Sequence, residues 1–497
     1  MKRTIRGEYI VFFLIVLAGL AARLHDVHYA FHVDEILSVK IASKPLTGVL
    51  EEALQDTSHP PLYYFSLYLW INVFGSSEES ARLLSVLFSC GFLCLSYMLL
   101  RRFVSLWLAL GLLSILAFSP LFISLEQPAR PYALIALLST VNLLAFMRVM
   151  EEAADEHKRL VVWALSCGLL LCAQYLSALM IALQICFALF YAPSKRLKIL
   201  LYGSVGSALI LPWFIAAFGS ALSSGDNPLP QISWISRPTP EDFLWSYFVV
   251  FGQIQGVSAR WLFILLGMIG TAYIKHLALS KTLPANHLLL FSIGFGLPMV
   301  VYALSIWGPQ SLFVVRQLIG TKIVFVGTIG LCLSTLPRRL AGCFLLALLI
   351  WMSAALPGAF QDNKRVSFRD AAEQIDRKYG SITVVTTEAD IGIPLDFYRK
   401  AGSVRLWETI AENDGGSRVI CRRPDTNSRL LFGEKSCSVI AENERSVQLL
   451  FLCKPTNCSD INTKALQSRH TLVAKWQAGL FSNVPQQLFL YEIRSVS

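Results

Sequence analysis

The chain has 497 residues, of which 55% are hydrophobic and only 15% are charged, and its mean hydropathy is +0.55. Ordinary soluble domains have roughly 45–50% apolar and about 25% charged residues, so this composition excludes such a domain and predicts a polytopic membrane protein. The formal net charge of +10 is spread over short basic clusters between apolar runs, as the positive-inside rule expects, and we therefore expect no nucleic-acid partner.

The charge pattern sets the topology of the N-terminal part. A first span is predicted near residues 9–24 and is preceded by three basic residues, which places the N-terminus in the cytoplasm. Small residues at the end of this span would also suit a signal peptide, and the loop that follows is extracytoplasmic in both cases. The next strong span, near 82–100, ends at Arg101-Arg102, which should lie inside. Residues 25–81 therefore form one outer loop.

This outer loop contains the apolar stretch PLYYFSLYLWINVFG, residues 61–75. It is shorter than the ~20 residues that a membrane span needs, and a full span here would put Arg101-Arg102 outside. We therefore predict a re-entrant or interfacial juxtamembrane helix.

The remaining spans alternate consistently with charge. They are predicted near residues 105–124, 131–149, 160–191 (two helices with an outer turn at QYLS), 199–218, 261–279, 288–307, 317–336 and 340–357. This arrangement gives about eleven transmembrane helices and an extracytoplasmic C-terminus. A long outer loop covers about 219–260.

The composition changes near residue 359, and we expect a transmembrane module over 1–358 and a soluble domain over 359–497. FRDAAEQIDRKYG predicts an amphipathic helix that ends at Gly380, and SITVVTT and LFLYEIRS predict strands, so the second domain should be a small extracytoplasmic α/β domain.

Cysteines in an extracytoplasmic domain have a suitable compartment for disulfides, and two bridges with three alternative pairings are open. The four cysteines of this region are Cys421, Cys437, Cys453 and Cys458.

With this topology, several ionisable residues fall at or near the outer membrane surface. They are Asp34, Glu35, His59, Arg130, Arg237 and Arg316. Ionisable groups near the membrane are energetically unfavourable and are candidates for function. Each also has a structural alternative. Asp34 could cap a helix that has Glu35 in its first turn, and the arginines could snorkel to lipid headgroups.

The set as a whole suits the transfer of a sugar from a lipid phosphate. One carboxylate suffices as general base for the acceptor hydroxyl. The leaving phosphate departs as an anion, so cationic groups replace the second carboxyl group that glycosidases commonly use as an acid. The bidentate geometry of arginine matches phosphate oxygens.

The chain carries the acidic pair Asp34-Glu35, then HPPLYY, and then ARPYAL after the next predicted spans. This order of motifs resembles the GT-C membrane glycosyltransferases, in particular protein O-mannosyltransferase-like, aminoarabinose transferase-like and Rgt-type proteins. The resemblance implies Asp34 as catalytic base with Glu35 beside it. It also implies Arg130, His59 and Arg316 as ligands of the donor phosphate.

Four further residues are expected to bind substrate: Tyr63, Tyr132, Arg237 and Trp234. His59 replaces a lysine of the aminoarabinose transferase-like proteins, and Ser58 replaces an acidic metal-contacting residue, so we expect no cofactor and no bound metal. Relatives often have Arg-Tyr where this chain has Arg316-Gln317.

We therefore predict an inverting glycosyltransferase of the bacterial inner membrane with a periplasmic active site and C-terminal domain. The donor would be a polyprenyl-phosphate sugar, with undecaprenyl phosphate as the expected carrier. The acceptor would be a hydroxyl of lipopolysaccharide, lipid A or another envelope glycan or lipid. The alternatives are a transporter or flippase for a lipid-linked or anionic solute, and a structural or sensory membrane protein. A transporter should have polar groups near the bilayer midplane, often in repeated halves, and no repeat is visible in the sequence.

Overall fold

The computed structural model describes most of residues 2–362 and parts of the remainder. The described residues are 2–25, 27–56, 58–152, 154–224, 235–280, 284–362, 368–380, 383–386, 389–400, 404–406, 408–409, 419–420, 449–453, 470–477 and 487–493. They divide into two compact units. The first consists of Met1–Val27 and Ala42–Phe360, and the second of His28–Ile41 and Gln361–Ser497.

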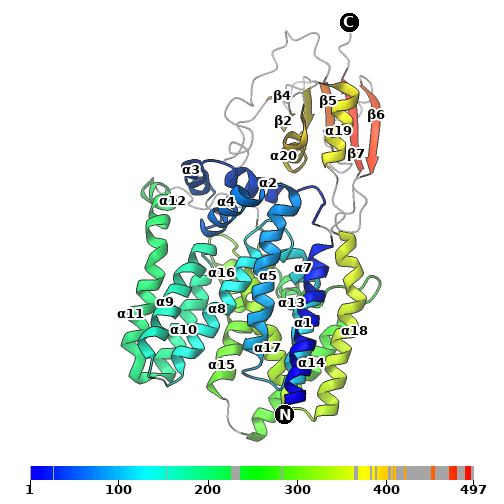
Figure 1. Ribbon diagram of the computed structural model, residues 1–497. Coiled ribbons are helices and arrows are strands. Elements are labelled where there is room, and N and C mark those ends of the chain that lie inside the picture. Colours follow the sequence, from blue (N-terminus) through cyan, green and yellow to red (C-terminus); the bar gives the residue numbers. More distant parts are fainter. Residues whose placement is uncertain are drawn as a thin grey trace. The chain divides into compact units, whose positions relative to one another are not determined.

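The first unit is a bundle of helices (Figure 1). Its α-helices are α1 (Lys2–Leu24), α3 (Leu46–Gln55), α4 (Leu62–Phe74), α5 (Glu78–Leu100), α6 (Leu106–Phe118), α7 (Pro120–Glu126), α8 (Tyr132–Met150), α9 (Glu156–Ala173), α10 (Ser177–Tyr191), α11 (Arg196–Ser207), α12 (Leu211–Ser224), α13 (Pro240–Phe248), α14 (Arg260–Ser280), α15 (Ala285–Phe291), α16 (Leu297–Trp307), α17 (Ile319–Ser334) and α18 (Arg338–Asp362). Short helical turns are η1 (Pro193–Lys195), η2 (Ala208–Ile210), η4 (Ser292–Gly296) and η5 (Val315–Leu318).

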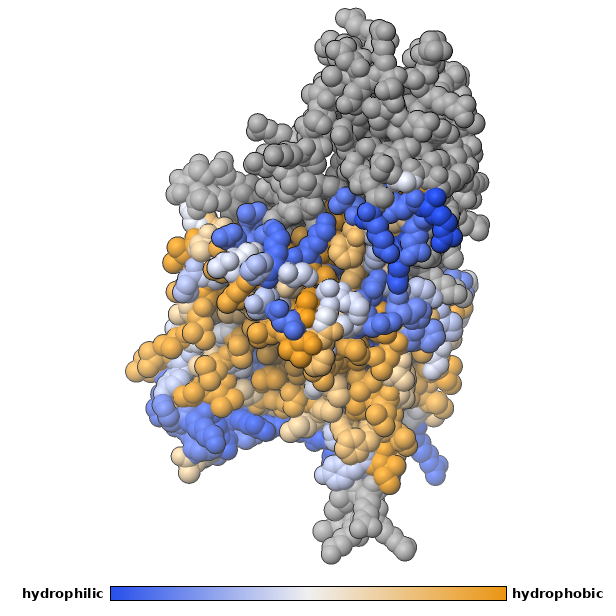
Figure 2. Space-filling model, turned by 45° about the horizontal axis from the view of Figure 1, so that its top comes forward, coloured by the Kyte–Doolittle hydropathy of each residue, from blue (hydrophilic) through white to orange (hydrophobic). Residues whose placement is uncertain are grey.

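The bundle has the composition of a membrane domain. Among the described helices, eight are long and apolar enough to cross a membrane, or nine if the bent pair α6–α7 is one span. Figure 2 shows hydrophobic residues over much of the visible face of the bundle, with hydrophilic residues gathered at its lower left end. The predicted polytopic α-helical membrane fold is confirmed. Each of the eleven predicted spans corresponds to a helix or helix pair, but α9 and α10 are outside the set of eight or nine, so the number eleven stays a prediction.

Charged residues from several predicted cytoplasmic turns meet at one end of the bundle. Arg102 Nη1 lies 2.8 Å from Glu151 Oε1, and Arg159 Nη1 lies 3.3 Å from the other oxygen of the same carboxylate. Lys195 Nζ donates to the carbonyl oxygens of Val149 and Glu151 at 2.8 Å. Turns that precede α6, α9 and α11 therefore share one end, as the predicted alternation of the spans requires.

Three short helices lie in the segment predicted as the first outer loop: α2 (Val33–Ala42), α3 and α4. The last of them, α4, has 13 residues, begins directly after Pro60-Pro61 and ends before Gly75, whose φ of 81° lies in the left-handed region. A 13-residue helix is too short to cross a membrane, so the prediction of a short helix here is confirmed. Its place at the membrane interface stays a prediction.

The predicted third span is broken at Ser119-Pro120, where α6 ends and α7 begins. Ser119 Oγ accepts from the Phe122 amide at 3.4 Å and caps α7, and Pro120 occupies the first turn, where its missing N–H is tolerated. The two helices bend by 53° at this point. Ser119 Oγ also donates to the Val250 carbonyl oxygen at 2.5 Å, which joins the bend to the segment after α13.

The second unit contains a sheet and three helices. Its elements are α2 (Val33–Ala42), α19 (Phe368–Tyr379), α20 (Ala389–Tyr398), β1 (Thr383–Thr386), β2 (Val404–Leu406), β3 (Glu408–Thr409), β4 (Val419–Ile420), β5 (Leu449–Cys453), β6 (His470–Gln477) and β7 (Gln487–Ile493). Five strands form a sheet in the order β2-β1-β5-β7-β6, in which β1 is parallel to β2 and β5, and β7 is antiparallel to β5 and β6.

Several elements of this unit lie where the sequence predicts them. The helix α19 ends before Gly380, which has a φ of 62°, and the strands β1 and β7 fall within SITVVTT and at LFLYEIRS. The side chains of the four C-terminal cysteines lie outside the described residues, so their pairing stays a prediction.

Candidate functional site

The structure brings together two of the three predicted phosphate ligands. His59 lies in the turn before α4, and Arg130 lies in the turn between α7 and α8, 71 residues further along the chain. Arg130 Nη2 is 2.9 Å from His59 Nε2, and both residues are buried. A guanidinium has only donors, so in this pair the imidazole must accept at Nε2 and carry its proton on Nδ1. The pair therefore brings the guanidinium of Arg130 and the imidazole of His59 together from two turns that are distant in the sequence.

A buried carboxylate that the sequence analysis did not single out lies beside this pair. Asp56 is 3% exposed; its carboxylate accepts from the Tyr64 hydroxyl and, at 3.2 Å, from the Ser58 amide. The His59 amide donates to the Asp56 carbonyl oxygen at 3.5 Å. Asp56 also acts on Tyr175, which lies in the turn between α9 and α10. Burial raises the pKa of the Tyr175 hydroxyl, and the negative charge of Asp56 raises it further. Asp56 thus fixes the turn from which His59 projects.

The two predicted substrate-binding tyrosines near this pair differ in their surroundings. Tyr63 is 1% exposed, and its hydroxyl lies 3.4 Å from Ser85 Oγ, so it packs α4 against α5. Tyr132 is 4% exposed and follows Arg130 by two residues. Within the described part of the chain, its hydroxyl has no hydrogen-bond partner. An unsatisfied buried hydroxyl is unfavourable, which makes Tyr132 the better candidate for a substrate contact.

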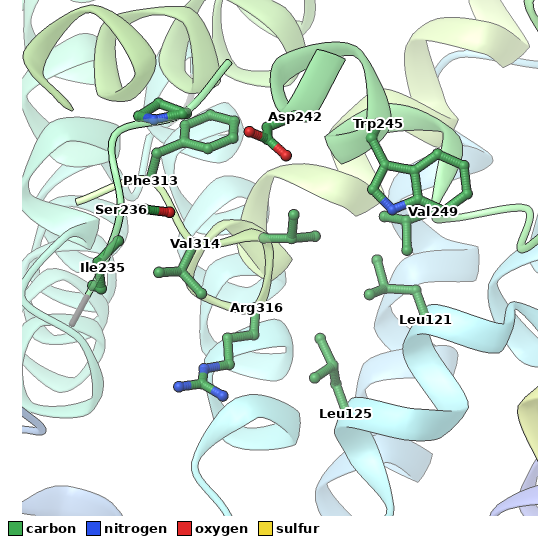
Figure 3. Close-up of a pocket in the computed structure, with 12 residues that line it drawn as sticks. Leu121, Leu125, Ile235, Ser236, Asp242, Trp245, Val249, Phe313, Val314 and Arg316 are labelled. Carbon is green, nitrogen blue, oxygen red and sulfur yellow. The ribbon is translucent and has the colours of Figure 1, made fainter. Parts of the chain in front are cut away.

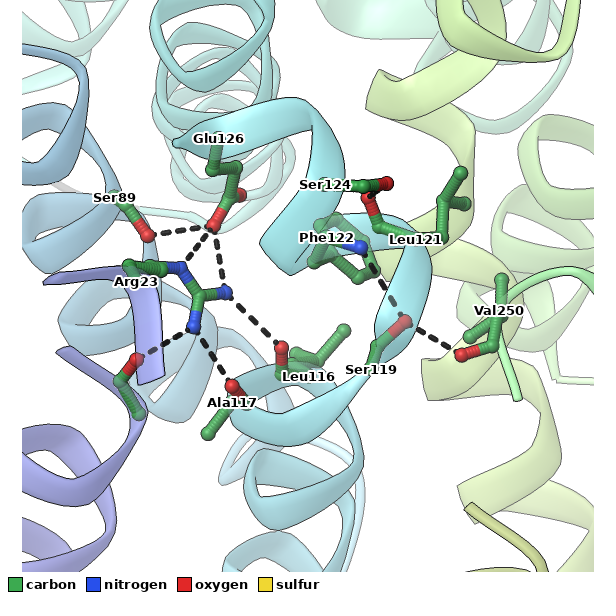
Figure 4. Close-up of polar contacts among 11 residues, drawn as sticks. Arg23, Ser89, Leu116, Ala117, Ser119, Leu121, Phe122, Ser124, Glu126 and Val250 are labelled. Carbon is green, nitrogen blue, oxygen red and sulfur yellow. Dashed lines mark hydrogen bonds and ion pairs between the residues drawn. The ribbon is translucent and has the colours of Figure 1, made fainter. Parts of the chain in front are cut away.

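A fully buried ion pair supports the turn that carries Arg130 (Figure 4). Arg23 on α1 donates to Glu126 Oε2 through Nε at 2.8 Å, and its Nη2 lies 2.7 Å from the same oxygen. Ser89 Oγ donates to this oxygen at 2.5 Å. Arg23 also donates to the carbonyl oxygens of Leu116 and Ala117 at the end of α6, which the bend at Ser119-Pro120 separates from the next helix.

Arg316 lies in a cavity of about 570 Å³ in the first unit. The cavity is lined by Leu121 and Leu125 of α7, by Trp245 of α13 and Val249 directly after it, and by residues from the segments 235–238 and 313–316 (Figure 3). Among the described residues that line it, Arg316 and Asp242 are charged.

The two charged residues of the cavity have different roles. Asp242 Oδ2 accepts from the backbone and side chain of Thr239 at 2.8 Å, which completes the capping box of α13 and lowers the pKa of this carboxyl. Arg316 therefore supplies the positive charge of a mostly apolar cavity. Gln317, beside it, accepts from Gln174 Nε2 at 2.6 and 2.8 Å, which ties η5 to the α9–α10 turn.

Two further predicted site residues belong to the long loop that the sequence predicts on the outer side. Arg237 is exposed and makes one long contact, 3.5 Å from Nη2 to the carbonyl oxygen of Gly308. Trp234 lies outside the described residues. Their roles in substrate binding stay predictions.

The acidic pair lies in the first turn of α2, within the second unit. Glu35 is 0% exposed, and its Oε2 accepts from the His32 amide at 2.9 Å, while the Asp34 amide donates to His32 Nδ1 at 3.4 Å. His32 and Glu35 therefore cap this helix reciprocally, as in a capping box. The two carboxylates have different environments, since Asp34 is only partly buried. The predicted proximity of Asp34 to the cations of the first unit stays a prediction.

Across the described residues, no group of three or more His, Cys, Asp or Glu side chains could hold a metal ion.

One family model matches part of the bundle. Residues 58–217 match the model of the family "dolichyl-phosphate-mannose-protein mannosyltransferase". The matched segment runs from the turn with His59, through Arg130, to α12. Over these residues the match agrees with the resemblance to GT-C membrane glycosyltransferases that the motifs predicted. Asp34, Glu35 and Arg316 lie outside the matched segment.

Several solved structures are also similar to this chain. ArnT from Cupriavidus metallidurans, in the apo state, is 14% identical with a TM-score of 0.46, and the similarity covers 98% of each chain. The same protein bound to undecaprenyl phosphate gives 15% identity and 0.45, over 97% of this chain and 98% of that one. The archaeal oligosaccharyltransferase AglB from Archaeoglobus fulgidus gives 13% and 0.45, over 80% and 64%. No curated protein matches the chain.

Proposed function

We propose that this protein is an inverting glycosyltransferase that moves a sugar from a polyprenyl-phosphate donor to a hydroxyl of a cell-envelope glycan or lipid. The observation that supports this proposal most is the buried His59–Arg130 pair, which provides a fixed positive charge. The pair lies inside the segment that matches a family named for a polyprenyl-phosphate sugar donor. A phosphate requires such a charge both when it binds and when it leaves.

The donor would bind through its phosphate and its apolar chain. Arg130, oriented by His59, and Arg316 would bind phosphate oxygens, and Tyr132 would donate to the sugar or the phosphate. The cavity at Arg316 supports this assignment, because it combines one guanidinium with leucine, valine and aromatic walls, and a polyprenyl phosphate joins an anionic group to a hydrocarbon chain.

Asp34 would act as general base in a single displacement. It takes the proton of the acceptor hydroxyl, the acceptor oxygen forms a bond to the anomeric carbon, and the bond from that carbon to the phosphate oxygen breaks. The electron pair of the broken bond leaves with the phosphate. Glu35 holds the first turn of α2 through His32 and so orients the base, and no metal takes part in this account.

The acceptor belongs to the outer face of a bacterial inner membrane in this proposal, with lipopolysaccharide, lipid A and other envelope glycans as the acceptor class. Undecaprenyl phosphate would be the carrier. The C-terminal domain would lie in the periplasm.

Mass spectrometry of envelope glycolipids tests the proposal. Cells that lack the gene should lose one sugar residue from one glycolipid, and complementation with the wild-type gene should restore it. Complementation with Arg130→Met should not restore it, whereas the Arg339→Lys variant, at an exposed position away from the proposed site, should. Identical glycolipids in all four strains would contradict the proposal, provided that the protein is present in the membrane of the complemented strains.

A further inference from the structure

The helix that carries Asp34 is part of the same compact unit as the C-terminal domain. Residues His28–Ile41 group with Gln361–Ser497 and not with the helices that flank them in the sequence. The contacts that make this association come from α19 and from the last turn of α20.

The start of the segment is held by two hydrogen bonds. The Tyr398 hydroxyl accepts from the Phe31 amide at 2.7 Å, and Arg369 Nη2 donates to the His28 carbonyl oxygen at 2.8 Å. Arg369 also lies 5.9 Å from the centre of the Tyr398 ring, a cation–π distance. The Phe31 ring meets the Phe397 ring edge-on, with 6.1 Å between centroids, and Phe31 is 2% exposed.

The other end of the segment meets the same turn of α20. Lys40 Nζ lies 3.8 Å from Asp396 Oδ2 and 6.0 Å from the centre of the Phe397 ring. Both charged side chains are about one-third exposed, so this ion pair contributes little by itself. Three consecutive residues, 396–398, therefore contact the segment on both sides of Asp34.

The last turn of α20 is itself anchored in its domain. Arg399 Nε donates to Asp376 Oδ1 of α19 at 2.8 Å, and the Lys400 amide donates to the second oxygen of the same carboxylate at 2.7 Å. The Arg399 side chain is 2% exposed, and its Nη2 donates to the Gly380 carbonyl oxygen at 3.0 Å. The end of α20, which contacts the segment that carries Asp34, is thus joined to α19.

We infer that the C-terminal domain is a positioning element for the transfer reaction: Tyr398, with Phe397 and Arg369, holds the helix that carries Asp34. This inference rests on the proposed role of Asp34 as base. Tyr398 has no place in the chemistry; it fixes the backbone three residues before the base. A change in the domain that releases this backbone would lower the rate of transfer and leave the binding of the donor phosphate unchanged.

Hydrogen–deuterium exchange of the full-length protein in detergent tests the contact without reference to activity. Tyr398→Phe removes the acceptor oxygen for the Phe31 amide and keeps the ring. We expect amides 31–40 to exchange about 3- to 10-fold faster, as the loss of one hydrogen bond predicts, while strands β1 and β7 keep their protection. Glu373→Gln is the matched control, since this exposed residue lies on α19 of the same domain. Unchanged exchange at 31–40 in Tyr398→Phe would overturn the inference.

Steady-state kinetics then test the coupling to the reaction. In Tyr398→Phe we expect kcat to fall about 3- to 10-fold with an unchanged KM for the donor, because the loss affects the base and not the phosphate ligands. Faster exchange together with wild-type kcat would overturn the positioning role. Absence of transfer in the wild-type protein would instead contradict the proposed function, and the exchange result would still decide whether the domain holds α2.

Discussion

The buried Arg23–Glu126 pair gives the sharpest prediction about the bundle, because both residues are 0% exposed and their contacts are unequal. In Arg23→Met, Glu126 keeps only the Ser89 hydroxyl as a described donor, and an uncompensated buried carboxylate costs about 3–5 kcal/mol. In Glu126→Leu, Arg23 keeps three carbonyl acceptors, at Gly19, Leu116 and Ala117, so we expect a smaller loss of about 2–3 kcal/mol.

The double variant separates an ion pair from two independent residues. Arg23→Met with Glu126→Leu leaves no buried charge at this site, so we expect a total loss of only about 1–3 kcal/mol, less than the sum of the single losses. The assay is the free energy of unfolding of the detergent-solubilised protein by denaturant titration. Arg237→Met, at an exposed position, is the control and should change it by less than about 0.5 kcal/mol. Additive losses in the double variant, or a wild-type value for Arg23→Met, would refute the reasoning.

Three further variants probe the site and the domain. Arg316→Lys keeps the charge but loses the bidentate geometry, and we expect the donor KM to rise about 10-fold, whereas it should not change in the exposed Arg339→Lys control. An unchanged KM in Arg316→Lys would remove Arg316 from the phosphate site. Tyr132→Phe should leave the unfolding free energy within about 0.5 kcal/mol of wild type, because the hydroxyl has no described partner, and yet lower kcat/KM; unchanged kcat/KM would contradict a substrate contact. Burial raises the pKa of the Asp396 carboxyl above its unfolded value of about 3.9, so the protonated carboxyl stabilises the folded domain below that pH, and this stabilisation is lost as pH rises through the raised pKa. Asp396→Asn should remove this pH dependence of the unfolding free energy. If the pH dependence persists in Asp396→Asn, another group causes it.

Patterns that are local in the sequence predicted most of the bundle. The alternation of apolar runs with basic clusters predicted the spans, and the structure has helices at each of them. This prediction is possible because length and hydropathy alone decide whether a helix can cross a membrane. The short α4 and the end of α19 at Gly380 were also predictable, because a proline pair and a glycine with positive φ mark helix ends locally.

Contacts between distant residues were not predictable in the same way. Arg23 and Glu126 are 103 residues apart, and each alone looks like an ordinary residue at the end of a helix. Asp56, in DTSH, reads as a turn residue, and only the fold shows that it is buried against Tyr64. The association of His28–Ile41 with the C-terminal domain depends on a tyrosine 367 residues from its partner amide, for which the sequence contains no periodic signal.

The most direct test of the account is transfer by the Asp34→Asn variant, measured with purified protein in lipid vesicles that contain the polyprenyl-phosphate sugar and the acceptor identified from the envelope glycolipids. The amide cannot accept the proton of the acceptor hydroxyl, so we predict that kcat falls by about 10²–10⁴-fold while the donor still binds. Asp34→Asn with wild-type kcat would contradict the assignment of the base.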